Sequence, residues 1–125
     1  MKIFLILMLM IFLHIVDDYY LQGVLAKMKQ RSWWEENAPQ DDYKHDYKVA
    51  LIMHAFSWSF MIMLPYIIIG INEYVACVAI LANATIHAIV DDLKANKKAI
   101  NLVVDQTAHI LQVFTTWLVA GLLGF

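Results

Sequence analysis

The sequence has few charged residues and almost no cysteine. Charged residues make up 16% of its 125 positions, and the formal net charge is −2. It therefore lacks the strongly basic surface that marks a nucleic-acid-binding protein, and we expect no nucleic-acid partner. A single cysteine, Cys77, excludes a disulfide within the chain and a zinc site built from several thiolates.

Hydrophobic residues are abundant instead. They make up 62% of the chain, and the mean hydropathy is +0.61. A soluble domain has roughly 45–50% apolar and about 25% charged residues. The length leaves room for about four helical passes of roughly 20 residues each. The composition therefore predicts a single all-α domain, residues 1–125, that forms an integral membrane four-helix bundle with up-down-up-down topology.

Four apolar runs predict the membrane spans. They cover about residues 2–22, 49–70, 73–91 and 100–124. The long polar segment between the first two, residues 23–48, contains the pair Trp33-Trp34 beside basic residues. Such a pair suits a helix at the level of the lipid headgroups, and a solvated loop is the alternative. A cleaved signal peptide is disfavoured for the first run because Asp17 and Asp18 follow it directly.

Basic residues set the expected orientation of these spans. All nine Lys and Arg except Lys2 lie in the segments that follow the first and third spans. Because cytoplasmic loops carry an excess of basic residues, segments 23–48 and 91–99 are expected in the cytoplasm and both termini outside. The sequence therefore predicts an integral protein of the bacterial inner (plasma) membrane.

Histidine and aspartate recur in the apolar runs at a spacing of four residues, which places each pair on one face of a helix. The pairs are His14 with Asp18, His87 with Asp91 and, in reverse order, Asp105 with His109, and His54 stands alone early in the second run. In the predicted topology all seven side chains lie at similar depth near the cytoplasmic edge of the bilayer. Ionisable groups inside a membrane are costly and usually functional. The arrangement repeats in the two halves of the chain, which suggests two related helical hairpins.

Imidazoles and carboxylates from facing helices form the metal sites of helical bundles. The seven residues are therefore predicted ligands for one or two divalent metal ions, and zinc, manganese and iron all suit a mixed His/Asp set. Two alternatives stay open, a metal-free hydrogen-bonded network and a proton or ion pathway. Asp17 and Asp92 are expected to be solvated at helix ends, and His45 is expected on the surface.

A divalent ion at the headgroup level can promote attack of water on an ester or phosphoester. The sequence thus predicts a metal-dependent hydrolase that acts on a lipid or lipid-linked molecule at the cytoplasmic leaflet. Asp18, Asp91 and Lys94 are the candidate catalytic residues, with Gln22 and Gln106 in support. Lys94 could bind a phosphate or a developing oxyanion, although we expect it to extend to the membrane surface.

Ordered motifs cover nearly the whole chain. They are His14, Asp18, Tyr19 and Leu21-Gln22 in the first span, His54 in the second, His87, Asp91 and Lys94 in the third, and Asp105, Gln106 and His109 in the fourth. Together they resemble a family of small bacterial and phage integral membrane proteins catalogued only as a domain of unknown function. Asp17 departs from the small residue that relatives often carry, which leaves open whether Asp17 or Asp18 points inward. A looser similarity to membrane-bound metal-dependent hydrolases implies hydrolysis.

Two functions of other classes compete with hydrolysis. A proton or cation pathway needs polar residues across the whole membrane, and the outer halves of the spans offer little beyond Ser57, Ser59 and Thr115-Thr116. A phage or bacterial interaction protein would use the polar cluster only to hold the bundle together. Its contact with a membrane protein partner would then lie in the Trp-rich segment 27–48, and a homo-oligomer fits either class.

Overall fold

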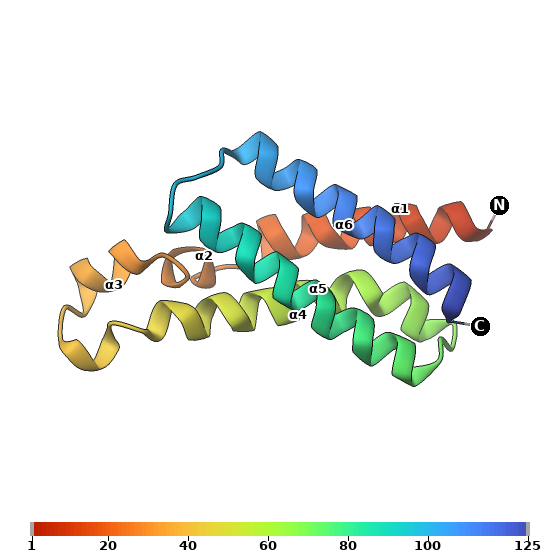
Figure 1. Ribbon diagram of the computed structural model, residues 1–125, viewed down its shortest axis with the longest axis horizontal. Coiled ribbons are helices and arrows are strands. Elements are labelled where there is room, and N and C mark those ends of the chain that lie inside the picture. The colour runs from red at the N-terminus through yellow and green to blue at the C-terminus, as the bar shows by residue number, and fades with distance from the viewer. Residues whose placement is uncertain (1, 125) are drawn as a thin grey trace.

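The computed structural model describes residues 2–124, and all of its regular elements are helices (Figure 1). In chain order these are α1 (Lys2–Ile15), the π-helical turn η1 (Val16–Leu21), α2 (Leu25–Met28), α3 (Arg31–Asn37), the short 3-10 helix η2 (Asp41–Tyr43), α4 (Asp46–Ile68), α5 (Glu73–Ala95) and α6 (Leu102–Leu123). The predicted all-helical class is confirmed. Of the predicted domain, positions 1 and 125 lie outside the described residues.

The four long helices pack side by side in a closed ring. α1 and α5 each pack against both α4 and α6. Successive long helices run in opposite directions, and α1 begins at the same end of the molecule at which α6 ends (Figure 1). Two hydrogen bonds join the elements at this end: Trp117 Nε1 donates to the carbonyl of Ile3 over 2.9 Å, and the Asn72 amide donates to the carbonyl of Gly124 over 2.9 Å.

Local sequence signals explain where the second half of the chain turns. Gly70 adopts a φ of +88°, which favours glycine, in the turn after α4. The Asn72 side chain then caps α5 by accepting from the amides of Tyr74 and Val75, and Asn101 caps α6 by accepting from the Val104 amide. The helices are longer than the predicted spans, since α4 already begins at residue 46 and α5 continues to residue 95.

Three segments are long and apolar enough to cross a membrane: Ile3–Leu21, Asp41–Ile68 and Glu73–Ala95. Helix α6 is not among them, because polar residues in its first half lower its mean hydropathy. Large apolar side chains nevertheless point outward from all four long helices, for example Phe4, Ile52, Leu81 and Leu122. Such exposure suits contact with lipid, and the crossing by α6 stays a prediction.

The polar segment between α1 and α4 is largely helical rather than an open loop. Trp33 and Trp34 lie on α3 with their rings edge to face, 5.0 Å apart. Trp34 Nε1 donates to the Met28 carbonyl over 2.7 Å, which ties α3 to α2. The helical alternative for the tandem tryptophans is therefore supported at residues 31–37.

An apolar core fills the half of the bundle near the chain ends. Its buried side chains include Met10, Trp58, Ile62, Met63, Val113 and Trp117. The polar residues predicted to form a site lie on the other side of this core, toward α2. The interior is therefore divided into an apolar half and a polar half.

Candidate metal centre

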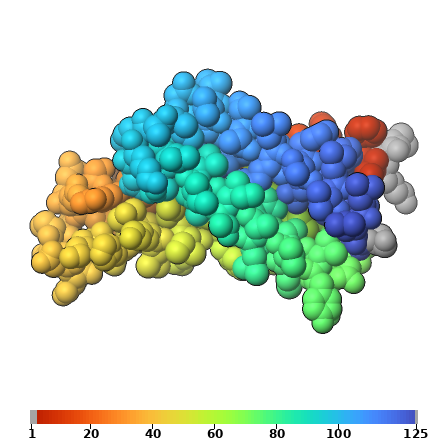
Figure 2. Space-filling model, in the orientation of Figure 1, coloured from red at the N-terminus to blue at the C-terminus, as the bar shows by residue number. Residues whose placement is uncertain are grey.

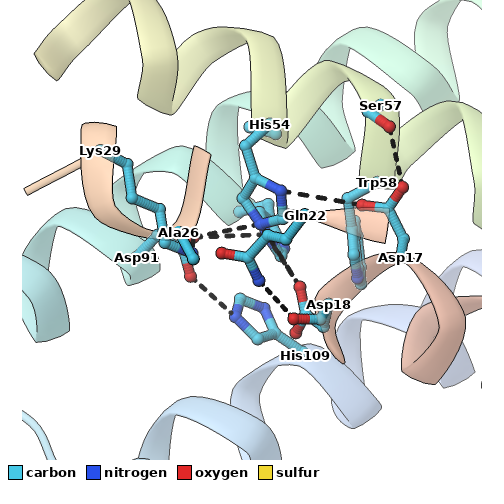
Figure 3. Close-up of polar contacts among 12 residues, drawn as sticks. Asp17, Asp18, Gln22, Ala26, Lys29, His54, Ser57, Trp58, Asp91 and His109 are labelled. Atoms are coloured by element: carbon cyan, nitrogen blue, oxygen red, sulfur yellow. Dashed lines mark hydrogen bonds and ion pairs between the residues drawn. The ribbon is translucent and has the colours of Figure 1, made fainter. Parts of the chain in front are cut away.

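The structure brings all seven predicted ligands into one buried cluster (Figure 3). The seven are contributed by α1 and η1 (His14, Asp18), α4 (His54), α5 (His87, Asp91) and α6 (Asp105, His109). Six of them are buried residues, and the Asp18 side chain is 7% exposed. The spacing of four residues thus places each pair on the inward face of its helix. The other two expectations hold as well, since His45 is exposed, and the Asp92 carboxylate pairs with Lys97 over 3.4 Å.

Four of these side chains converge on one point. His54 Nε2 lies 3.1 Å from His87 Nε2, 3.3 Å from Asp18 Oδ1 and 3.4 Å from Asp91 Oδ2. His87 Nε2 lies 3.9 Å from the same Asp18 oxygen and 3.6 Å from the same Asp91 oxygen. Metal–ligand bonds of about 2.0–2.1 Å in a tetrahedral site put the ligand atoms roughly 3.3 Å apart. The four atoms therefore have nearly the mutual spacing of the corners of a tetrahedral metal site.

One atom of this set has no hydrogen-bond partner. Asp18 Oδ1 is buried and accepts no hydrogen bond of acceptable geometry, although it faces His54 Nε2 and His87 Nε2. Leaving a buried carboxylate oxygen without a donor is costly. A cation between these atoms would satisfy it, so the donor set fits a metal ion.

The π-helical turn η1 points both aspartates of the pair inward. A π turn adds a residue to the helical repeat and often occurs at functional sites. Here the Gln22 amide donates to the carbonyl of Asp17, five residues earlier, over 3.1 Å. The expectation that Asp17 is solvated is wrong, since it is 1% exposed and accepts a hydrogen bond from Ser57 Oγ over 2.8 Å. The turn changes the register, so that Asp17 faces α4 while Asp18 faces the centre of the cluster.

Asp17 also lies behind the ring of His54. Asp17 Oδ2 is 3.7 Å from His54 Nδ1, on the opposite side of the imidazole from the four converging atoms (Figure 3). Metal-binding histidines commonly have a carboxylate near their second nitrogen, which orients the ring. Sequence reasoning missed Ser57 in this role, although it follows His54 by three residues and so shares its helix face.

Trp58 orients two further histidines. Its Nε1 donates to His14 Nδ1 over 2.8 Å, which commits that nitrogen to a hydrogen bond instead of a metal. The His87 ring is stacked between Trp58 and His109, with ring centroids 4.2 and 4.1 Å away. Sequence reasoning did not identify Trp58, which fixes His87 by packing and His14 by hydrogen bonding.

The α6 residues form the flank of the cluster. His109 Nε2 lies 3.3 Å from Asp91 Oδ1 and 3.4 Å from Asp105 Oδ1, so His87, Asp91 and His109 make a second, overlapping set of potential ligands. Gln106 Nε2 donates to Asp105 Oδ2 over 3.0 Å. Lys94 does not extend away to the surface as expected, since its Nζ donates to Asp105 Oδ2 over 2.7 Å.

Lys29 enters the cluster from the segment after α2. Its Nζ donates to Asp91 Oδ2 over 2.6 Å, and its side chain is only 12% exposed. Asn96 Nδ2 at the end of α5 donates to the Lys29 carbonyl over 3.1 Å and holds this segment in place. Sequence reasoning assigned Lys29 only to the orientation of the spans, and no local pattern connects it with a residue 62 positions away.

The charges of the cluster do not cancel. With ionised carboxylates and neutral imidazoles, four negative charges meet two positive ones. The carboxylates are Asp17, Asp18, Asp91 and Asp105, and the ammonium groups are Lys29 and Lys94. An uncompensated charge in a buried site is strongly unfavourable. The excess of two negative charges matches a single divalent cation.

Comparisons with known proteins leave this site to be interpreted from its own geometry. No family model, no curated protein and no solved structure matches the chain. The resemblance to the family of small bacterial and phage membrane proteins therefore stays a prediction.

Proposed function

We propose that this protein is a membrane-embedded metalloprotein that holds one divalent cation between Asp18, His54, His87 and Asp91. The observation that carries the proposal is the convergence of these four side chains, with printed separations of 3.1 to 3.9 Å and an unpartnered Asp18 oxygen. The net charge of the cluster supports the same conclusion.

One ion fits better than two. The two overlapping ligand sets share His87, and one imidazole nitrogen binds one metal ion at a time. A second divalent cation would also change an excess of two negative charges into an excess of two positive ones. Two imidazoles and two carboxylates suit zinc, manganese or iron.

We further propose that the site hydrolyses an ester or phosphoester of a lipid or lipid-linked molecule at the cytoplasmic leaflet. A divalent ion held there supplies Lewis-acid activation of the scissile group. His109 lies beside both Asp91 and Asp105 and is placed to hold a proton during the reaction. Lys94, 36% exposed and paired with Asp105, provides a positive charge for a phosphate or a developing oxyanion. The apolar helices around the site support a lipid substrate.

Hydrolysis is tested with the full chain in vesicles that contain ester lipids and lipid-linked phosphoesters, incubated in ¹⁸O-labelled water. Because water attacks the carbonyl carbon or phosphorus and the leaving alcohol takes a proton, the released acid or phosphate should carry ¹⁸O in wild type. Asp91→Asn should lower the turnover at least 100-fold, and Asp92→Asn should leave it unchanged. Turnover that survives Asp91→Asn, or a metal-loaded wild type that releases no product, would overturn the hydrolase half of the proposal.

The structure favours hydrolysis over a proton or ion pathway. Beyond Trp58 the described interior is filled by apolar side chains such as Ile62, Met63 and Val113. Ser59, one of the few polar residues there, is already bonded, since its Oγ donates to the Ala55 carbonyl over 2.7 Å. A proton flux into vesicles that depends on His87 would support the pathway instead.

Replacing Lys29 by methionine should strengthen metal binding. The ammonium group lies 2.6 Å from a proposed ligand oxygen and repels a divalent cation bound to the same carboxylate. We expect Lys29→Met to lower the dissociation constant for Zn²⁺ at least about tenfold, or 1.4 kcal/mol. Calorimetric titration of the metal-stripped protein measures this change.

The neighbouring exposed lysine is the control. Lys27→Met removes the same charge from the surface of α2, and its effect on the dissociation constant should stay within about twofold because exposed charges are screened. Weaker binding in Lys29→Met would show that Lys29 supports the ion rather than competing with it.

A further inference from the structure

An apolar groove lies between α5 and α6, on the side of the molecule that Figure 2 shows. Its volume is about 590 Å³, within the range of small-molecule sites. Val78 and Ala82 on α5 face Leu111 and Val119 on α6 across it. The groove is separate from the proposed metal ligands, none of which lines it.

The groove has the length of one lipid chain. It extends along α5 from Tyr74 to Ile86, which corresponds to about 18 Å of helix. One leaflet contributes roughly 15 Å of hydrocarbon to a bilayer. Its inner end, at Ile86 and Ala108, adjoins His87 and His109 in the sequence, so a chain in the groove would point its head end toward the cluster.

One buried acceptor lines the groove without a donor. Gln112 is 8% exposed, and its Nε2 donates to the Asn83 carbonyl over 2.7 Å. Gln112 Oε1 is buried and has no hydrogen-bond partner, while the Asn83 Oδ1 beside it already accepts from Thr116. An unpaired amide oxygen in apolar surroundings is unfavourable, so the occupant is expected to bring a hydrogen-bond donor.

We propose that this groove binds one hydrocarbon chain of a lipid that carries a hydroxyl or amide N–H near its head end, with that group donating to Gln112 Oε1. Gln112 is three residues, about 4.5 Å along the helix, from His109. The donor therefore lies within one helical turn of the cluster. This names the lipid class for the proposed hydrolase, and only the link to turnover rests on that function.

The size of the groove favours a lipid chain over a second copy of this protein. A helix of the same length and roughly 10 Å in diameter occupies on the order of 1,400 Å³. That is more than twice the volume of the groove, whereas a single extended chain is much thinner. Contact between copies is an outcome that the experiment below can reveal.

The test uses the full chain in phosphatidylcholine vesicles doped with a lipid whose acyl chain bears a photoactivatable diazirine. One probe has a hydroxyl at the third carbon of that chain, and the other lacks it. We expect labelling to concentrate on α5 and α6, at least fivefold stronger for the hydroxylated probe. Gln112→Met keeps the length of the side chain without the acceptor and should abolish this preference.

Two substitutions fill the groove and one serves as a matched control. Ala82→Phe on α5 and Thr115→Phe on α6 place a ring at exposed positions that line the groove, and each should reduce labelling at least fivefold. Leu81→Phe changes the adjacent exposed residue outside the groove and should label like wild type. Retained helical circular dichroism identifies the variants that fold.

The labelling should persist in chelator and in Asp91→Asn, because no proposed ligand lines the groove. Loss of hydrolysis with retained labelling would therefore overturn the proposed function alone. Labelling spread evenly over all outward helix faces, or photo-crosslinks between copies at Ala82 and Thr115, would overturn the lipid groove.

Discussion

Asp91→Asn should weaken the binding of a divalent cation at least 100-fold, while Asp92→Asn should change it less than about twofold. Asp91 lies within 3.6 Å of His54, His87 and His109, and it is the carboxylate that Lys29 contacts. Loss of a ligand should cost more than the roughly 10–100-fold seen when groups behind a ligand are changed. Asp92 is the next residue, yet its carboxylate bonds to Asn96 at the surface of α5.

Titration of the metal-stripped proteins with Zn²⁺ or Co²⁺ measures these dissociation constants. The two variants carry the same chemical change at adjacent positions, so a general effect of charge removal would appear in both. Equal weakening in both variants would contradict the assignment of Asp91 as a ligand. Unchanged affinity in Asp91→Asn would exclude the four-residue site.

Chelation should destabilise the wild-type protein below a variant that lacks two of its ligands. Without an ion the wild-type cluster has an excess of two negative charges, whereas Asp18→Asn with Asp91→Asn leaves two carboxylates opposite Lys29 and Lys94. The double variant should therefore unfold at a higher temperature than chelated wild type. An ion at 100 times its dissociation constant should stabilise wild type by about 2.7 kcal/mol and the double variant not at all.

Thermal unfolding in detergent, followed by circular dichroism with and without Zn²⁺, tests the charge balance. Asp92→Asn with Asp41→Asn removes two carboxylates from outside the cluster and is the matched control, which should respond to Zn²⁺ as wild type does. Chelated wild type that is more stable than the Asp18→Asn, Asp91→Asn variant would show that the excess charge is compensated without a metal.

The sequence was sufficient to locate the cluster because spacing determines which side chains share a helix face. His14 with Asp18 and His87 with Asp91 required only a helical repeat and an inward orientation. The position of Asp17 could not be predicted in the same way. A π turn changes the repeat by one residue within a few positions, and the tyrosines and aspartates of η1 carry no pattern that identifies it.

Contacts between distant segments were also beyond the sequence. Lys29 reaches Asp91 because Asn96 fixes the backbone at residue 29, and neither contact follows from periodicity. Trp58 fits the pattern of an apolar core residue, so its hydrogen bond to His14 could be found only from the packing.

The fold was predictable in class and less so in detail. The apolar runs located the four long helices, but capping by Asn72 and Asn101 determined where two of them begin. Helix α6 has the length of a membrane span, yet Asp105 and His109 lower its hydropathy. The residues that make α6 part of the site are thus the ones that weaken its membrane signal.

Elemental analysis of the purified full chain tests the proposed centre most directly. We expect one divalent transition-metal ion per chain in wild type, and less than a tenth of that amount in Asp91→Asn purified in the same way. Two ions per chain would contradict the charge balance. A folded wild-type protein that neither contains a metal nor takes one up from Zn²⁺, Mn²⁺ or Fe²⁺ would show that the cluster is not a metal site.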